Sequence, residues 1–277
     1  MTAPQRLVSL PRDVRTAGGH GLLGRRIDRT HPVPPARFTL RLDWYDTADR
    51  LWWDPDGPAR LLHAMNPTRL AFYLRELGAP AGLRVLDAGC GGGLVARGLV
   101  GAGAVVYGLD LSRPSLQVAR RAAGGAFHPV EGTLERLPFA DGSLDAVVAA
   151  DVLEHMGDLP AVVAELARVL APGGRLLFDT INRTLWAWFV GIFGSERVVG
   201  LVPRGTHDWR LFIRPDELDR LLRAQGLSAV ATTGLVPRIG PRDIARALVT
   251  RRIDPPRFAL AADRRALYLG HYRKQVA

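Results

Sequence analysis

The sequence predicts a doubly wound α/β fold, in which helices cover both faces of a mostly parallel sheet. Short apolar runs alternate with helical segments from residue 84 to residue 181, and strands separated by helices form a parallel sheet. Two of the apolar runs end in an acid, at Asp87 and Asp110. The first is followed by the turn Gly89-Cys90-Gly91-Gly92-Gly93. Such a turn after the first strand is typical of this class, whose ligands bind at the carboxyl ends of the strands.

The elements follow from hydrophobic period and from proline and glycine signals. Residues 58–77 are expected to form a helix that Pro67 interrupts, because proline lacks the backbone N–H. The expected strands are 84–87, 104–110, 126–130, 144–150, 175–181, 227–235 and 266–272. The helices expected between them are 94–101, 113–123, 159–170 and 215–225. The result is a Rossmann-like sheet that is mostly parallel, with an antiparallel last strand.

The chain of 277 residues is expected to form one domain preceded by an arm. Residues 1–40 are rich in Arg, Pro and Gly without a sustained period, which predicts a flexible arm. In the single domain, 41–277, we expect an N-terminal helical cap at 41–80, an insertion at 182–212 and an Arg- and Pro-rich insertion at 236–264. The tryptophans of 41–57 are expected to pack on the core or to cover a pocket.

Composition excludes several classes of protein. The single cysteine, Cys90, rules out an internal disulfide and a cysteine-based zinc site. The net charge of +10 is almost all arginine, with Lys274 the only lysine, and no nucleic-acid-binding motif accompanies it. We therefore expect no nucleic-acid partner. Without a ~20-residue apolar run or an apolar signal core, we expect a cytoplasmic protein. The oligomeric state stays open.

The glycine turn and the acid after it indicate a nucleoside cofactor. Glycines let the backbone turn sharply beside a ligand, and Asp110 could accept hydrogen bonds from both ribose hydroxyls. Nicotinamide enzymes share these features. Three details favour S-adenosylmethionine (SAM): Asp87 precedes the turn, the run 170–174 (Leu-Ala-Pro-Gly-Gly) precedes the fifth strand, and acids at 151–155 follow the fourth. Together they resemble the class I SAM-dependent methyltransferases.

A narrower resemblance covers roughly residues 41–235. The runs 51–57 (Leu-Trp-Trp-Asp-Pro-Asp-Gly), 62–70, 180–183 and 203–209 (Pro-Arg-Gly-Thr-His-Asp-Trp) are similar to those of the ubiquinone-biosynthesis O-methyltransferases. That family methylates polyprenyl catechols and phenols. The resemblance implies a SAM-dependent O-methyltransferase with a small, apolar, hydroxylated acceptor, and it makes a polyprenyl quinone precursor one candidate for that acceptor.

The resemblance also assigns cofactor residues. Arg69, which follows Asn-Pro, would bind the methionine carboxylate of SAM, and the family's cofactor positions map onto Gly89, Asp110 and Ala150. The other cofactor candidates at the same strand ends are Asp87, Gly91, Leu111, Thr133 and Leu134.

The family holds a divalent metal with Glu-x-x-Glu-His, which here reads Asp151, Glu154 and His155. The resemblance thus implies Mg²⁺, or else Mn²⁺ or Zn²⁺, on one face of a helical turn. Asp151 departs from the family pattern, which has Glu at this position. If the resemblance is set aside, these acids are interpreted as residues of a loop that cap the next helix. His155 and Glu154 are also the catalytic candidates. His155 could act as general base, as metal ligand or as an orienting residue, and the sequence does not choose.

The region 182–212 is expected to build the acceptor side. Its apolar run, 185–193, would either contact a membrane surface, as the family's insertion does, or form a pocket lid, and His207 and Asp208 would line the pocket or be structural. Other readings remain: a natural-product O-methyltransferase of polyketide type, a nicotinamide-dependent oxidoreductase, for which the Tyr-x-x-x-Lys constellation is missing, and a non-methylating scaffold.

Overall fold

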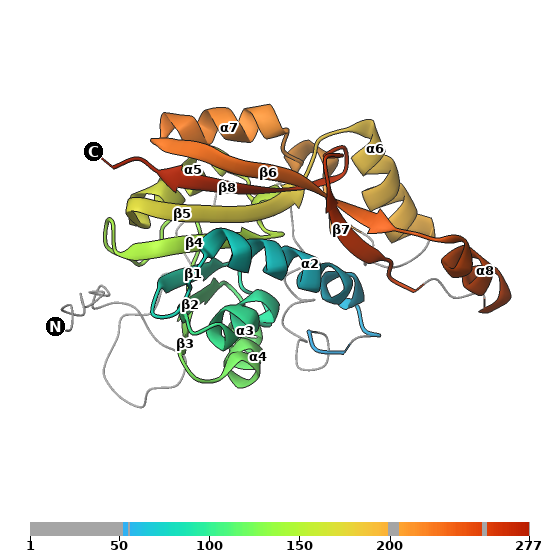
Figure 1. Ribbon diagram of the computed structural model, residues 1–277, viewed down its shortest axis with the longest axis horizontal. Helices are drawn as coiled ribbons and strands as arrows, with labels where there is room; N and C mark the ends of the chain where they lie inside the picture. Colours follow the sequence, from blue (N-terminus) through green and yellow to red (C-terminus); the bar gives the residue numbers. More distant parts are fainter. Residues whose placement is uncertain (1–51, 55, 199–204, 251–253, 277) are drawn as a thin grey trace, which may run out of the picture.

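The computed structural model describes residues 52–54, 56–198, 205–250 and 254–276 (Figure 1). The predicted flexible arm at 1–40 and most of 41–57, including Trp44, lie outside this part of the chain. Among the described helices, none is long and apolar enough to cross a membrane.

The described residues form an eight-stranded sheet in the order β3-β2-β1-β4-β5-β8-β6-β7. The first five strands in this order are parallel, whereas β8 pairs antiparallel with β5 and β6, and β7 pairs antiparallel with β6. The predicted α/β class with its antiparallel last strand is therefore confirmed, and β7 is an addition. The strands are β1 (Arg84–Ala88), β2 (Val105–Asp110), β3 (Phe127–Glu131), β4 (Leu144–Ala150), β5 (Leu170–Ile181), β6 (Leu227–Arg238), β7 (Arg257–Ala261) and β8 (Leu267–Lys274).

Helices cover both faces of the sheet (Figure 1). Neighbouring strand residues bury into opposite cores: Val85 lies in the cluster covered by α2, α3 and α4, and Leu86 in the cluster covered by α5 and α7. The helices are α2 (Arg60–Leu77), α3 (Leu94–Gly101), α4 (Arg113–Ala123), α5 (Leu159–Val169), α7 (Pro215–Ala224) and α8 (Pro241–Thr250). Strand order reverses between β1 and β4, and ligands of open α/β sheets bind at such a point, beyond the strands' carboxyl ends.

Helix α2 corrects one expectation, because Pro67 lies inside it and does not interrupt it. The missing N–H costs the helix one backbone hydrogen bond. The helix offsets this loss by burying Phe72, Tyr73 and Leu77 completely against the sheet. Tertiary packing therefore overrides the local signal.

One strand boundary and one region differ from the sequence-based expectation. Strand β5 begins at Leu170 rather than at residue 175, because a register irregularity lets the chain pair with β4 before Gly173 turns at a φ of 75°. The region 236–264, for which the sequence predicted no element, holds the end of β6, helix α8 and strand β7.

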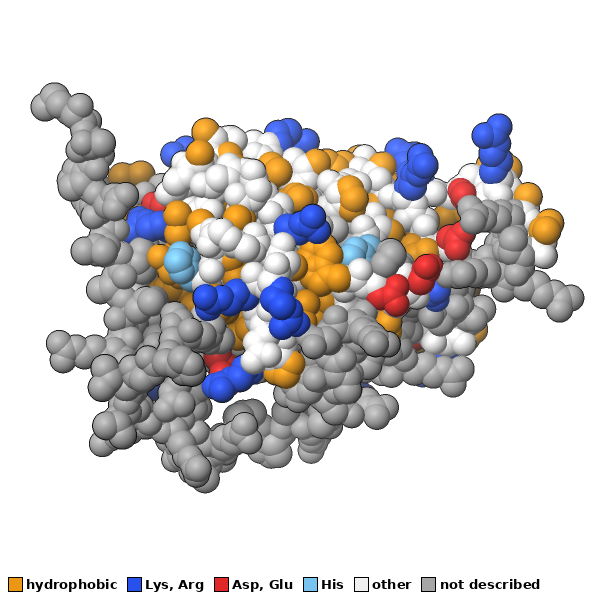
Figure 2. Space-filling view, turned by 90° about the horizontal axis from the view of Figure 1, so that it is seen from below, with side chains coloured by type: hydrophobic (Ala, Val, Ile, Leu, Met, Phe, Trp, Pro, Cys, Tyr) orange, Lys and Arg blue, Asp and Glu red, His pale blue; other side chains and the backbone are white. Residues whose placement is uncertain are grey.

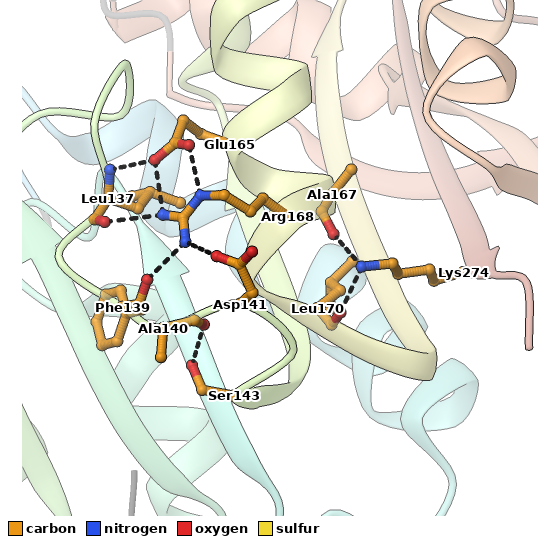
Figure 3. Close-up of polar contacts among 10 residues, drawn as sticks. All are labelled: Leu137, Phe139, Ala140, Asp141, Ser143, Glu165, Ala167, Arg168, Leu170 and Lys274. Carbon is orange, nitrogen blue, oxygen red and sulfur yellow. Dashed lines mark hydrogen bonds and ion pairs between the residues drawn. The ribbon is translucent and has the colours of Figure 1, made fainter. Parts of the chain in front are cut away.

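Arg168 fixes the amino end of the sheet (Figure 3). Its guanidinium donates hydrogen bonds to the carboxylates of Glu165 and Asp141 and to the carbonyls of Leu137 and Phe139. These bonds tie the loop before β4 to the end of α5. The loop therefore has an architectural role, at the opposite end of the strands from the glycine turn.

On the face shown in Figure 2, the Lys and Arg side chains of the described residues are scattered among hydrophobic, uncharged and a few acidic ones.

Candidate cofactor and active site

The glycine turn is closed by Asp110. Gly89, Gly91 and Gly93 have φ angles of 72°, 49° and 82°, which favour glycine. Gly91 N–H donates to Asp110 Oδ2 at 2.9 Å, and Gly89 N–H donates to the carbonyl of Leu109 at 2.8 Å. The turn and the end of β2 therefore form one hydrogen-bonded unit.

Protein side chains occupy the space that glycine leaves free in this turn. A Cβ on Gly89 would lie 2.5 Å from Val152, and one on Gly91 would lie 2.4 Å from Trp52. Trp53 Nε1 also donates to the carbonyl of Gly92 at 2.9 Å. Trp52 and Trp53 therefore pack on the turn, and part of its need for glycine comes from this packing.

Asp110 keeps capacity for a ligand. Its Oδ1 accepts from Ser112 N–H at 2.9 Å, and burial raises its pKa. Each carboxylate oxygen has a second lone pair, so Asp110 can accept further hydrogen bonds. Leu111, the next residue, is 53% exposed.

The remaining nucleoside candidates, Thr133 and Leu134, lie after the neighbouring strand, β3. The Leu134 side chain is buried in the core covered by α5 and α7. Thr133 is exposed, and its backbone forms an isolated bridge with Arg136.

A buried charged cluster lies between helix α2 and the ends of β1 and β5. Arg69, Tyr73, Asp87 and Asp179 are each at most 3% exposed. Arg69 Nη1 lies 3.7 Å from Asp179 Oδ2, and the Tyr73 hydroxyl donates to Asp179 Oδ1. Burial raises the pKa of Asp87 to about 7 and that of Asp179 to about 6, although Arg69 opposes both shifts.

Three charged atoms of this cluster have no hydrogen-bond partner among the described residues: Arg69 Nη1, Asp87 Oδ2 and Asp179 Oδ2. Buried polar groups are normally paired, so these exceptions mark the cluster as a place for a ligand. One cationic and two anionic atoms fit a zwitterionic amino acid, such as the methionine part of SAM.

Sequence reasoning identified Arg69 and Asp87 but not Tyr73 or Asp179. A signal for each exists: Tyr73 follows Arg69 by four residues on the same helix face, and Asp179 is an acid near the end of a predicted strand.

The residues after β4 include two of the predicted metal ligands, Asp151 and Glu154. Asp151 has a φ of 53°, which is uncommon outside glycine, and its N–H donates to the carbonyl of Asp179 at 3.2 Å. Glu154 is buried, accepts from Thr180 Oγ1 at 2.8 Å and keeps Oε1 unpartnered among the described residues. Burial raises the pKa of Glu154 well above its usual value.

The structure does not assemble the predicted metal ligands. Among the described residues, no group of three His, Cys, Asp or Glu side chains could hold a metal ion. The expectation placed Asp151, Glu154 and His155 on one helical face. Only the 3₁₀ turn η1 (Leu153–His155) is helical, however, and the left-handed backbone of Asp151 breaks the repeat before it. The arrangement does not fit the metal that the resemblance implied.

His155 faces a second histidine. Its ring stacks on that of His207, with centroids 5.9 Å apart. Burial and His207 lower the pKa of His155 to about 4, so the ring is neutral at physiological pH. His207 Nδ1 lies 2.8 Å from Glu196 Oε1, and the buried Glu196 also accepts from Gly205 N–H at 2.8 Å. Sequence reasoning did not identify Glu196.

The segment after β5 exposes a row of apolar side chains. It contains α6 (Leu185–Ala187), the π-helix η2 (Trp188–Val198) and, further along the chain, the 3₁₀ turn η3 (Trp209–Leu211). The Asp208 carboxylate caps η3 by accepting from the Arg210 N–H. Ala187 and Ile192 are buried in a small core. The exposed large hydrophobic residues of this segment are Leu185, Trp186, Trp188, Phe189 and Phe193.

Residues 86–178 match the family model described as methyltransferase domain. The chain is 38% identical over 239 residues to the ubiquinone biosynthesis O-methyltransferase of Alkalilimnicola ehrlichii, covering 84% of this chain and 90% of that protein. It is 41% identical over 220 residues to the protein of the same name from Methylobacterium sp. strain 4-46, covering 74% and 88%.

Solved structures show the fold alone. A SAM-dependent methyltransferase from Mesorhizobium loti matches with a TM-score of 0.54 at 23% identity, over 76% of this chain and 100% of that one. Magnesium protoporphyrin IX methyltransferase from Synechocystis, solved with bound SAH, matches with a TM-score of 0.51 at 23% identity, over 78% and 84%. From this identity and coverage, the chain belongs to the ubiquinone biosynthesis O-methyltransferase family and is a SAM-dependent O-methyltransferase.

Proposed function

We propose that this enzyme methylates a phenol- or catechol-type hydroxyl of a polyprenyl quinone precursor. The observation that carries the proposal is the 38% identity to a ubiquinone biosynthesis O-methyltransferase over 90% of its length. The named relatives favour this acceptor over a polyketide-type one, and family membership favours methyl transfer over hydride transfer.

The cofactor would lie across the carboxyl ends of β1, β2 and β4. Arg69 would bind the methionine carboxylate and Asp87 the ammonium, because each has a charged atom without a hydrogen-bond partner in one buried cluster. Asp110 would accept from the ribose hydroxyls. The exposed Leu111 would pack on the base, and the remaining contacts would come from the backbone of Gly89, Gly91, Thr133, Leu134 and Ala150.

When bound, SAM supplies an electrophilic methyl group and keeps the sulfur electron pair as the methyl leaves. The protein has to align the acceptor oxygen with that methyl and accept the hydroxyl proton. A phenol has a pKa of ~10, so few molecules ionise unaided at neutral pH. A hydrogen bond from the hydroxyl to a neutral base makes the oxygen more nucleophilic as the methyl approaches.

His155 is our candidate for this base. Its ring is neutral, so a ring nitrogen can accept a hydrogen bond from the acceptor hydroxyl, and stacking on His207 fixes the plane of the ring. Glu196 in turn holds His207. Glu154, beneath the turn, fixes η1 to β5 through Thr180. No step here uses a divalent cation, since the described residues do not fit one.

We also propose that the exposed apolar row of α6 and η2 contacts a membrane surface, where a polyprenyl acceptor would reside. Its support is the exposure of Leu185 (79%) and Phe189 (52%) beside Arg265, whose guanidinium lies over Trp186 at 5.6 Å. Replacing Trp186 and Phe189 with serine should reduce sedimentation with anionic liposomes while leaving SAM affinity unchanged. Wild-type protein that never sediments would leave a pocket lid as the role of this row.

The function itself is tested by methyl transfer from labelled SAM to three acceptors. These are a catechol with a short prenyl tail, the same catechol without the tail, and a polyketide-type phenol. We expect turnover with the prenylated catechol to exceed that with the other two. A preference for the polyketide-type phenol would contradict the proposed acceptor. The same assay in excess chelator tests whether Mg²⁺, Mn²⁺ or Zn²⁺ takes part, because loss of activity would show that turnover needs a divalent cation.

A further inference from the structure

Asp179 lies on the same face of the sheet as Asp87, beneath helix α2. Asp87 pairs with Val148 on β4, and Val148 pairs with Leu177 on β5. Asp179 follows Leu177 by two residues, and residues two apart on a strand point to the same face. Val148 and Leu177 belong to the core that α2 covers, so both acids face that helix, which contributes Arg69.

Negative charge exceeds positive charge in this cluster. Arg69 interacts electrostatically with three carboxylates, those of Asp179, Asp151 and Asp87. When all three are ionised, one positive charge faces three negative ones. Burial is the main cause that raises the pKa values of Asp87 and Asp179, and neighbouring carboxylates add to it, while Arg69 opposes both shifts. A ligand that brings positive charge would correct the imbalance.

We propose that Asp179 is a second carboxylate of the cofactor site, which together with Asp87 favours the positively charged cofactor over its uncharged product. This inference rests on the proposed function. SAM carries an ammonium, a carboxylate and a sulfonium, and therefore one net positive charge. After the methyl leaves, the sulfur keeps its electron pair as a neutral thioether, so SAH has no net charge. The excess of carboxylates stabilises bound SAM more than bound SAH, and thereby favours product release.

Tyr73 is the positioning residue for this carboxylate. Its hydroxyl donates to Asp179 Oδ1, while Arg69 Nη1 stands 3.7 Å from Oδ2, too far for a hydrogen bond. The carboxylate is thus fixed through one oxygen, and its other oxygen remains for the ligand. Tyr73 acts on the cofactor through Asp179.

The test is the ratio of SAH to SAM dissociation constants, measured by calorimetry on the full chain. We expect Asp179→Asn to weaken SAM binding by about tenfold, as loss of a charged hydrogen-bond acceptor does, and SAH binding by less. The preference for SAM should shrink accordingly. Tyr73→Phe should change the ratio in the same direction by a smaller factor. Asp145→Asn, which removes a carboxylate from the other end of the sheet, should leave the ratio unchanged.

The outcomes separate the two proposals. Wild-type protein that binds neither ligand would refute the cofactor site itself. Wild-type protein that binds both, with an unchanged ratio in Asp179→Asn, would overturn only the role of Asp179. If Asp179→Asn does not fold, as judged by circular dichroism, Tyr73→Phe decides, and an unchanged ratio in that variant overturns the inference.

Discussion

The two ends of the same sheet treat charged side chains in opposite ways. At the amino end, Arg84 donates to both carboxylate oxygens of Asp145, and this pairing lowers the pKa of Asp145 despite partial burial. At the carboxyl end, Asp87 and Asp179 are more deeply buried, and each keeps one oxygen without a hydrogen-bond partner among the described residues. Their pKa values are raised.

The difference between the two ends shows where charged side chains reduce the stability of the folded state. A paired charge at a half-buried site is neutral or favourable for folding, whereas a buried charge without enough partners destabilises the folded state. Such groups persist where a ligand needs them, so the uncompensated end of the sheet is the functional end. The comparison requires that charge removal affect binding at one end and only stability at the other.

The largest effect is expected at Asp110. Asp110→Ala should weaken SAM binding by about a hundredfold or more, because it removes the acceptor for two ribose hydroxyls and also the bond that closes the glycine turn. Calorimetry with SAM measures the loss. The matched control is Glu131→Ala, one strand away in the same register, whose carboxylate pairs with the exposed Arg113. Equal losses in the two variants would contradict the role of Asp110.

A smaller loss of SAM affinity is expected from Asp87→Asn, together with a gain in the stability of the cofactor-free protein. Burial is the main cause that raises the pKa of Asp87 from 3.8 to about 7, with smaller contributions from Asp110 and Asp179 and with Arg69 opposing. Between those pH values the folded state binds the proton more tightly than the unfolded chain. Wild-type stability without cofactor therefore falls as pH rises through this window, and the cost is complete above pH ~7.

The neutral amide of the Asp87→Asn variant carries no such cost. The variant should therefore melt above the wild type at pH 8, by about 2–4 °C for each kcal/mol relieved, with the difference disappearing near pH 4. SAM affinity should fall in the same variant. Scanning calorimetry of the cofactor-free proteins at both pH values checks this, and a variant less stable than the wild type at pH 8 would show that the Asp87 charge is not a cost.

The sequence predicted the sheet and much of its functional end, for local reasons. Acids at strand ends and a glycine turn are short-range signals, so the residue order alone places Asp87 and Asp110 together. Asp179 carries a similar signal, an acid near the end of a strand, but the sequence does not reveal its partner Tyr73, which lies 106 residues earlier in the chain.

The three expected metal ligands are not brought together among the described residues, for a related reason. A spacing of three and four residues implies convergence only on a continuous helical turn. The backbone of Asp151 is left-handed there, which spacing cannot reveal.

The smallest effect is expected at the amino end. Asp145→Asn breaks the pair with Arg84, whose donor and acceptor atoms are 2.8 Å apart in a half-buried position. Because such a pair contributes only about 1 kcal/mol, the free energy of unfolding should fall by about that amount. The loss should be present at pH 7 and should vanish as pH falls through the lowered pKa of Asp145.

SAM affinity, by contrast, should stay within about twofold of wild type, since Asp145 lies a strand length from the cluster around Arg69. Urea unfolding and calorimetry on one preparation measure both quantities. A variant that lost SAM affinity as strongly as Asp179→Asn would show that charge acts on the cofactor through the whole sheet, and the contrast between its two ends would not hold.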